Sequence, residues 1–452
     1  MIVCQAYRFA LDPTPRQQGA LASAVGGARF AYNWGLELVK QRLDERATGQ
    51  DVAVPWTLSA LRREWNRAKG EVAPWWQENS KEAYSSGLDA LARGLKNWAD
   101  ARAGRRAGAP MGFPRRKKKG RGRQGCRFTT GAIRLEPDRH HVVLPRLGRL
   151  KTHESTRKLA RHLERGTGRI LSATISRHAG RWFVSFTCEV QRAQRRPRNP
   201  AATVGVDVGI KHLAVLSGGE QIANPQPLTA ARRKLGRLNR QLARCHGPVA
   251  ADGTPRAPSA GWRQAQAELA RLHARIANLR AQALHQLTSR LAGTYGTVVV
   301  ERLNVAGMVR NRRLARAIAD SGMGQVRRLL GYKTSWAGGR LIQADRFYPS
   351  STTCSGCGTV KAKLPLSERL FRCDNQACGL VGDRDENAAR NLAALVELIQ
   401  TQQMVVAGSG PETGINACAR DCQPTGDGGR SGNPGEHTAS RTAAGSQQPI
   451  RV

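Results

Sequence analysis

The stretch Val204-Gly205-Val206-Asp207-Val208-Gly209-Ile210-Lys211 places one carboxylate inside a short run of small and apolar residues. Such a run predicts a strand over residues 203–208, and a second strand follows near residues 212–216. An unpaired aspartate in a buried strand is costly, so Asp207 requires a cation or a cluster of hydrogen-bond donors. This position therefore marks a candidate site within an α/β part of the chain.

Two further segments put acids at the edge of an apolar element. Glu301 ends the run Val298-Val299-Val300, and Asp383 and Asp385 stand at the start of an Ala- and Leu-rich helix. Three carboxylates from distant segments can converge on a pair of divalent cations, and oxygen ligands suit Mg²⁺ or Mn²⁺. Two such ions ~4 Å apart activate a water and stabilise the leaving oxygen in phosphodiester hydrolysis. The three acids together therefore predict a metal-dependent nuclease.

Each acid also has an ordinary structural explanation. A role as helix N-cap would by itself explain Asp383, because aspartate fills that role readily. Glu301 can pair with a nearby arginine. Asp207 is the hardest of the three to explain without a functional role, and only the whole set makes the metal site persuasive.

A second candidate site comes from cysteines at metal-ligand spacing. Four of the ten cysteines form a CxxC pair and a CxxxxC pair, and a glycine directly follows each pair, which permits a tight turn. Four thiolates fill a tetrahedral site, so we predict a structural Zn²⁺ rather than a catalytic one. A redox CxxC would leave the second pair unexplained. The predicted zinc ligands are Cys354, Cys357, Cys373 and Cys378.

Composition narrows the class of partner. The 452 residues include 73 Lys and Arg against 33 Asp and Glu, a formal net charge of +40. A charge of this size requires a polyanion, and nucleic acid is the leading partner. These values fit poorly with a small-metabolite enzyme or a secreted disulfide-rich protein. We find neither a membrane-spanning apolar run nor a signal peptide, so we expect no membrane partner and a soluble, cytoplasmic protein.

The first half of the chain divides by texture. Residues 2–10 predict a strand, and a helical pattern with six tryptophans follows to about residue 100; these tryptophans are expected to be mostly core anchors. Residues 127–145 and 168–190 predict β-structure, including a hairpin that turns at residues 178–181. Before these β segments, at residues 101–126, lies a Gly-rich basic stretch, which we interpret as a flexible phosphate-binding loop. Its candidate contacts are Arg115, Arg116, Lys117, Lys118, Lys119, Arg121 and Arg123.

The second half begins after an Arg- and Pro-rich linker at residues 191–200. A long helix follows the first α/β strands, and its leucine stripe from Leu269 to Leu291 is predicted to be core. Residues 406–452 contain few apolar residues and predict a disordered tail.

Taken in order, these motifs resemble the TnpB (OrfB) family of transposon-encoded proteins and the related miniature type V CRISPR effectors. The resemblance spans about residues 5 to 400, and its last two motifs carry most of the specificity. The matching motifs are Asp12-Pro13-Thr14-Pro15, Arg29-Phe30-Ala31-Tyr32-Asn33, Gly112-Phe113-Pro114-Arg115, Gly205-Val206-Asp207-Val208-Gly209, Val300-Glu301-Arg302-Leu303, the segment Phe347–Gly358, and Asp383-Arg384-Asp385-Glu386-Asn387-Ala388-Ala389.

The resemblance implies an RNA-guided DNA endonuclease that cuts target DNA beside a short flanking motif. It implies a catalytic triad of Asp207, Glu301 and Asp385, with Asp383 as the alternative third acid. Its partners would be a guide RNA and double- and single-stranded target DNA, close to the nucleoid of a prokaryotic cell. The rival interpretation is a guide-free RuvC-type nuclease or a transposase accessory protein; co-purifying RNA would separate the two.

The same resemblance implies a multidomain α+β fold. We expect a wedge β-barrel at residues 1–10 and 107–198 and a helical recognition domain at 11–106. An RNase H-like RuvC nuclease domain is expected at 199–345 and 383–405, with a zinc ribbon inserted at 346–382. Two departures from the family pattern are the wide CxxxxC spacing and a long Gly-, Pro- and Arg-rich loop over residues 229–260.

Overall fold

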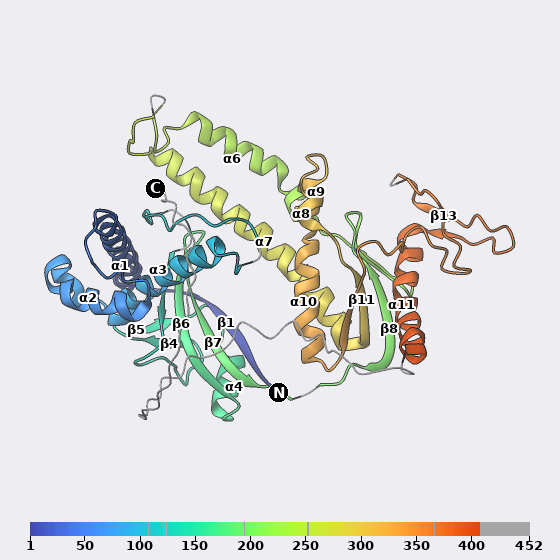
Figure 1. Cartoon of the computed structure of the whole chain (residues 1–452), viewed down its shortest axis with the longest axis horizontal. Helices are drawn as coiled ribbons and strands as arrows, with labels where there is room; N and C mark the ends of the chain where they lie inside the picture. Colours follow the sequence, from blue (N-terminus) through green and yellow to red (C-terminus); the bar gives the residue numbers. More distant parts are fainter. Residues whose placement is uncertain are drawn as a thin grey trace, which may run out of the picture. The chain divides into compact units, whose positions relative to one another are not determined.

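The structure is a computed structural model that describes residues 1–406 except positions 107, 121, 123, 194, 251, 252 and 366. The predicted tail therefore lies outside the described residues, apart from Val406 at the end of the last helix. Helices and strands both contribute, which agrees with the predicted α+β class (Figure 1). None of the described helices has both the length and the hydropathy of a membrane span.

The first sheet joins the N-terminus of the chain to the predicted hairpin. It is antiparallel, with the order β1-β7-β6-β2. The hairpin prediction is confirmed, because β6 and β7 are joined by Ala179 and Gly180, both with positive φ, as a two-residue turn requires. The strands are β1 (Ile2–Leu11), β2 (Gln124–Phe128), β6 (Gly168–His178) and β7 (Arg181–Gln191).

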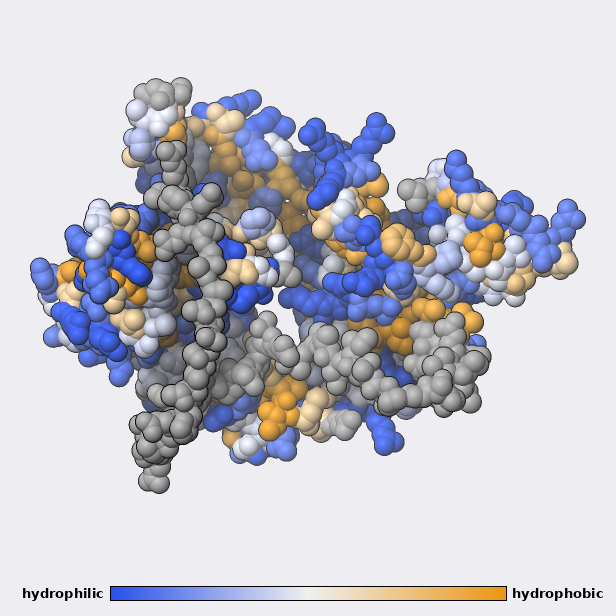
Figure 2. All heavy atoms as spheres, in the orientation of Figure 1, coloured by the Kyte–Doolittle hydropathy of each residue, from blue (hydrophilic) through white to orange (hydrophobic). Residues whose placement is uncertain are grey.

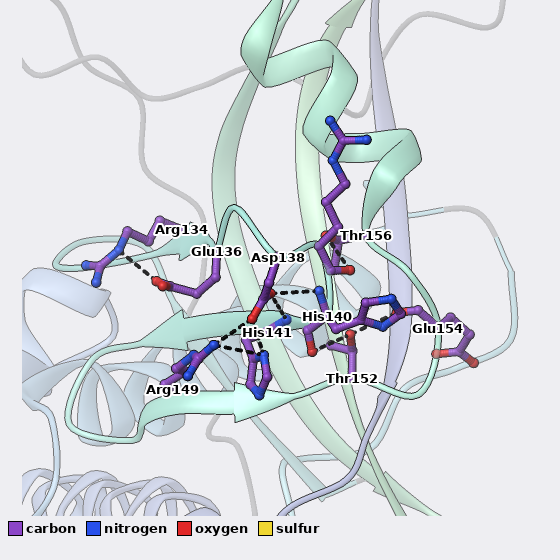
Figure 3. A network of polar contacts seen from close by, with 10 residues as sticks. Arg134, Glu136, Asp138, His140, His141, Arg149, Thr152, Glu154 and Thr156 are labelled. Atoms are coloured by element: carbon purple, nitrogen blue, oxygen red, sulfur yellow. Dashed lines mark hydrogen bonds and ion pairs between the residues drawn. The ribbon is translucent and has the colours of Figure 1, made fainter.

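A smaller sheet packs on the same core and is tied to β1 by polar contacts. It contains β3 (Arg134–Leu135), β4 (His141–Leu144) and β5 (Gly148–Lys151), and α4 (Arg157–Glu164) follows it. Asp138 accepts hydrogen bonds from the His140 amide at 2.9 Å and from Arg149 at 2.5 Å (Figure 3). Glu154 accepts one from the Ala10 amide of β1 at 2.8 Å. The Asp138 contacts hold the small sheet together and the Glu154 contact joins it to β1, so this network has a structural role.

The helical region between β1 and β2 has its own core. Thr14 and Gln17 form a reciprocal capping box at the start of the first helix. Trp65 is buried, as predicted for a core anchor, whereas Trp75 is 38% exposed and does not follow that prediction. The elements are α1 (Pro15–Ala47), α2 (Leu58–Val72), the 3₁₀-helix η1 (Pro74–Glu78) and α3 (Lys81–Arg102).

A mixed five-stranded sheet forms the next part of the chain. Its order is β10-β9-β8-β11-β12, with β8, β11 and β12 parallel and β9 and β10 antiparallel. The predicted strand at 203–208 begins earlier, at Asn199, because it pairs with β11 over a longer stretch. The strands are β8 (Asn199–Asp207), β9 (His212–Leu216), β10 (Gln221–Ala223), β11 (Tyr295–Glu301) and β12 (Arg340–Ala344).

Helices cover both faces of this sheet. Helices α7 (Ala260–Thr294) and α10 (Met323–Trp336) pack on the face that includes Val206 and Val300. Helix α11 (Arg384–Val406) packs on the other face, against Val299. Figure 1 shows α11 running alongside β8. Short helices α8 (Val305–Met308) and α9 (Ala315–Ser321) lie between β11 and α10 along the chain.

Two predictions about the long helix are corrected. Of the predicted apolar stripe, Ile276, Leu284, Leu287 and Leu291 are buried, while Leu279 is 43% exposed. The three leucines at the C-terminal end pack against the sheet, and Leu279 lies outside that contact. The segment 229–260, predicted as a loop, contains the last two residues of α5 (Pro227–Ala230) and all of α6 (Arg232–Arg244), which packs beside α7 (Figure 1).

Candidate active site

Asp207 and Glu301 lie beside each other at the carboxyl ends of two parallel strands. Val206 of β8 pairs with Val300 of β11, so the acids that follow are level with each other. The two valines face the core under α7 and α10. Because side chains alternate along a strand, both acids project from the opposite face, toward α11.

Helix α11 approaches this face of the sheet unusually closely, and Gly205 makes the approach possible. A Cβ at Gly205 would lie 1.9 Å from the carbonyl oxygen of Ala389 and 2.6 Å from the amide of Ala393, both in α11. Gly205 is two residues before Asp207 and therefore points to the same side of the strand. The absent side chain lets the first turn of α11, which carries Asp385, reach Asp207.

The proximity of these acids appears in the electrostatics of Asp207. Burial and, after it, the charges of Glu301 and Asp385 together raise the pKa of its carboxyl to about 8. Arg384 opposes the rise, and Asp383 adds a smaller contribution in the same direction as the other acids. The oxygens of the three acids are not all within 4.8 Å of one another, but the two other acids disfavour the charged form of Asp207, so the arrangement suits a cation.

The two candidates for the third acid have different roles in the structure. One carboxylate oxygen of Asp383 accepts hydrogen bonds from the amides of Asp385 at 2.8 Å and Glu386 at 3.1 Å. Asp383 is therefore the helix cap that its sequence position suggested. Asp385 is partly buried, and an oxygen of its carboxylate lies 3.6 Å from the Arg369 guanidinium.

Glu301 does not have the arginine partner that the structural alternative predicted. It forms no ion pair with any residue that the structure describes; instead, it accepts a hydrogen bond from the hydroxyl of Ser350. Ser350 lies between β12 and the cysteine cluster and was not identified from the sequence as a site residue. A cavity of about 270 Å³ beside Glu301 is lined also by Val208, Asn304 and Arg327.

The four predicted zinc ligands come together. Their sulfur atoms all lie within 4.8 Å of one another, which no other group of described metal-binding side chains achieves. The Sγ atoms are 3.7 Å apart for Cys354 and Cys378 and 3.5 Å apart for Cys357 and Cys373. Tetrahedral Zn–S bonds of ~2.3 Å place sulfurs about 3.8 Å apart, so the cluster fits a zinc ion.

The backbone around the cysteines explains how they converge. Gly358 and Gly379 have positive φ values of 77° and 59°, as the tight turn after each pair requires. The strands β13 (Leu370–Arg372) and β14 (Val381–Asp383) form the hairpin that presents the second pair. The hairpin ends at the first residue before α11, so the cluster and the acids share one continuous segment.

Two asparagines of α11 join the cysteine cluster to the acids, and the sequence did not single them out. Asn387 accepts a hydrogen bond from the Ser355 amide at 2.9 Å and donates one to the Thr353 carbonyl at 2.7 Å. Asn391 donates to the carbonyls of Ser350 and Thr353, both at 2.7 Å. Their four-residue spacing, which places both on one helix face, was the available signal.

The basic loop between α3 and β2 is anchored rather than free along its length. The side chain of Asn33 donates to the Lys117 carbonyl at 3.0 Å and accepts from the Lys117 amide at 2.8 Å. The Lys117 ammonium lies 3.9 Å from the centre of the Tyr32 ring, and burial lowers its pKa. The loop residues Arg115, Arg116, Lys117, Lys118 and Lys119 are all exposed at the surface, whereas Arg121 and Arg123 lie outside the described residues.

An exposed arginine-rich segment after Glu301 was missed at the sequence level. Figure 2 shows strongly hydrophilic residues over the region of α8 and α9. The segment contains Arg310, Arg312, Arg313 and Arg316, none of which forms an ion pair with a described acid. The sequence signal that could have identified it is the occurrence of four arginines within seven residues.

Comparison with known families gives matches along most of the chain. A model of the OrfB family described as "Probable transposase" matches residues 185–312, and "Cas12f1-like, TNB domain" matches 324–392. A "Helix-turn-helix domain" model matches residues 1–48, although this part of the chain folds as one strand and one long helix, β1 and α1.

The most informative relatives are similar over nearly their whole length. A "Putative RNA-guided DNA endonuclease" of Mycobacterium tuberculosis H37Rv is 41% identical over 413 residues, covering 87% of this chain and 86% of the relative. InsQ of Escherichia coli K12, with the same description, is 29% identical, and the match covers 89% of this chain and 95% of InsQ. A solved complex of Cas12f1 with single guide RNA and target DNA has a TM-score of 0.47 at 12% identity; the match covers 87% of this chain and 99% of the Cas12f1 chain. The chain therefore belongs to the OrfB family, also called TnpB, as its motifs predicted.

Proposed function

We propose that this protein is an RNA-guided DNA endonuclease whose nuclease site is formed by Asp207, Glu301 and Asp385. The observation that carries the proposal is the convergence of these acids from β8, β11 and α11. The names of the full-length relatives support the same activity. Cleavage is directed to target DNA beside a short flanking motif, with a guide RNA supplying sequence recognition.

The order of the five-stranded sheet supports an RNase H-like RuvC domain. Along the sheet, β10, β9 and β8 pair antiparallel, and β11 and β12 run parallel to β8. Asp207 lies at the end of β8, the central strand. Within this scheme, residues 199–345 and 383–405 form the nuclease domain and residues 346–382 a zinc ribbon. Residues 11–106 form the recognition domain, and the two sheets of residues 1–10 and 107–198 form the wedge.

The donor sets match two kinds of metal. Asp207, Glu301 and Asp385 offer hard oxygen ligands suited to Mg²⁺ or Mn²⁺, which would activate a water and stabilise the leaving oxygen. A bound cation would favour the charged form of Asp207, whose pKa of about 8 results from burial and from the charges of the neighbouring acids. Asp383 stays with the helix cap and orients Asp385. The four cysteines hold a structural Zn²⁺.

Guide RNA and target DNA are held mainly through their phosphates. A net charge of +40 requires such a partner, and exposed cations occur in the basic loop and after Glu301. The arginine-rich segment at residues 310–316 comes soon after β11, which ends at the catalytic acid Glu301. We therefore assign to it the phosphates of the DNA strand that is cut. We place this activity in the cytoplasm of a prokaryotic cell, where its DNA target is found.

The test uses the full chain produced together with its own flanking DNA. RNA that co-purifies is sequenced, and target cleavage is measured in Mg²⁺ for the unaltered protein and for Asp207→Ala. We expect one defined RNA species, loss of cleavage by at least 100-fold in the variant, and retained guide-dependent DNA binding. Unchanged cleavage by Asp207→Ala would contradict the assignment of the site. Cleavage without any defined RNA would favour a guide-free nuclease.

A further inference from the structure

Ser350 contacts a candidate catalytic acid from a different part of the chain. The residue is only 3% exposed, and its hydroxyl donates a hydrogen bond to one carboxylate oxygen of Glu301. A carboxylate held at one oxygen loses much of its rotational freedom. The other oxygen then keeps a defined direction in the absence of a metal ion.

The position of Ser350 is itself fixed by α11. The side-chain amide of Asn391, a residue that is 5% exposed, donates to the Ser350 carbonyl at 2.7 Å. The backbone carbonyl of Asn391 accepts from the Tyr348 hydroxyl at 3.1 Å. The same helix carries Asp385 two turns earlier. A single helix therefore presents one acid directly and positions a second acid through Ser350.

The cysteine cluster is part of the same unit. Asn387 and Asn391 both donate to the Thr353 carbonyl, and Asn387 accepts from the Ser355 amide. Thr353 and Ser355 are the two neighbours of the zinc ligand Cys354. Side-chain and backbone hydrogen bonds thus connect the cluster to Glu301 through the loop 348–355, in which Ser350 and Cys354 are buried.

We propose that Ser350 is a positioning residue for Glu301, and that the loop 348–355 couples the zinc ribbon to the divalent-cation site. The proposal rests on the function proposed above in one respect, namely that Glu301 is a cation ligand. Groups that orient a ligand without touching the metal typically change metal affinity by ~10–100-fold when removed. Loss of the Ser350 hydroxyl should act in that range.

The experiment compares Ser350→Ala with two variants of the full zinc-loaded chain. Ser351→Ala removes a neighbouring hydroxyl that has no hydrogen-bond partner among the described residues, and Ser350→Thr keeps a hydroxyl at the position itself. Mn²⁺ binding is measured by electron paramagnetic resonance on RNA-free protein, and zinc content and thermal unfolding are measured on the same samples. The Mg²⁺ concentration giving half-maximal cleavage is then measured with guide RNA.

We expect Ser350→Ala to bind Mn²⁺ about tenfold more weakly and to need about tenfold more Mg²⁺, with cleavage recovering at saturating Mg²⁺. Zinc content and guide-RNA binding should not change. Ser351→Ala should match the unaltered protein, and Ser350→Thr should recover most of the lost affinity.

Three results separate the explanations. Unchanged Mn²⁺ affinity in Ser350→Ala overturns the proposal. If Ser350→Ala unfolds or loses zinc, Ser350→Thr decides: recovery supports the hydroxyl, whereas an equal loss overturns it. If Glu301→Gln itself binds Mn²⁺ and cleaves as well as the unaltered protein, the proposed nuclease site fails, and that outcome is distinct from failure at Ser350.

Discussion

At the residue scale, Asp207 combines a destabilising position with a chemical use. It is buried and its neighbours on β11 and α11 are also acids, so without a cation its carboxylate is disfavoured and its pKa rises to about 8. A site that stabilises the folded protein would not place three acids together. The arrangement is explained if the molecule gives up some stability in order to bind cations there.

We predict that Asp207→Asn stabilises the protein in Mg²⁺-free buffer while abolishing cleavage. The carboxyl has a pKa of about 8 when folded and near 3.8 when unfolded. The folded state therefore binds more protons between these values, so stability falls as pH rises through that window. Thermal unfolding of zinc-loaded protein between pH 6 and 8.5 should show this fall, and Asp207→Asn should show a weaker one. A fall of equal size in both proteins would mean that another group is responsible.

At the element scale, the close contact between α11 and β8 determines which acids meet. Gly205 removes the side chain that would keep the helix away, and the Asp383 cap sets where the helix begins. Helix α11 then places Asp385 near Asp207 and turns Asn387 and Asn391 toward the loop before the cysteine cluster. One helix thus organises both candidate metal sites.

We predict that Gly205→Ala both destabilises the protein and reduces cleavage. Its Cβ would lie 1.9 Å from the Ala389 carbonyl oxygen, so α11 must shift. Overpacking of this kind costs ~1–3 kcal/mol in free energy of unfolding. The matched control is Gly218→Ala, since a Cβ there meets no atom within 4 Å and φ is not positive. Urea unfolding and cleavage rates would test both; a Gly205→Ala protein as stable and active as the control would refute the close contact.

At the scale of the whole molecule, the cationic residues behind the net charge of +40 differ in whether they pair with acids. Many arginines, such as Arg67, Arg134 and Arg169, already pair with acids. Those at 310–316 have no acidic partner among the described residues and lie in the segment that follows Glu301. Phosphate binding releases counterions only where such cations are available.

We therefore predict a weaker salt dependence of DNA binding when Arg310, Arg312 and Arg313 are all replaced by alanine. Each lost phosphate contact lowers the slope of log affinity against log salt by about 1. The control replaces Arg67, Arg134 and Arg169, which changes the net charge by the same amount but removes paired residues. Equal slopes for the two triple variants would show that net charge alone, and not this segment, governs binding. Fluorescence anisotropy over a salt series would measure them.

The sequence by itself determined the local features: the strands around Asp207 and Glu301, the β6–β7 hairpin, the four cysteines that form one cluster, and the family. These depend on the spacing and type of residues close together in the chain, which a linear pattern preserves. Only the tertiary structure decided that Ser350 reaches Glu301, that Asn33 anchors Lys117, and that part of the α7 stripe is exposed. The physical reason is that these outcomes depend on packing between distant segments, which a local pattern does not record. The Ser350–Glu301 and Asn33–Lys117 contacts join residues 49 and 84 positions apart, and the approach of α11 to Gly205 joins segments about 180 residues apart.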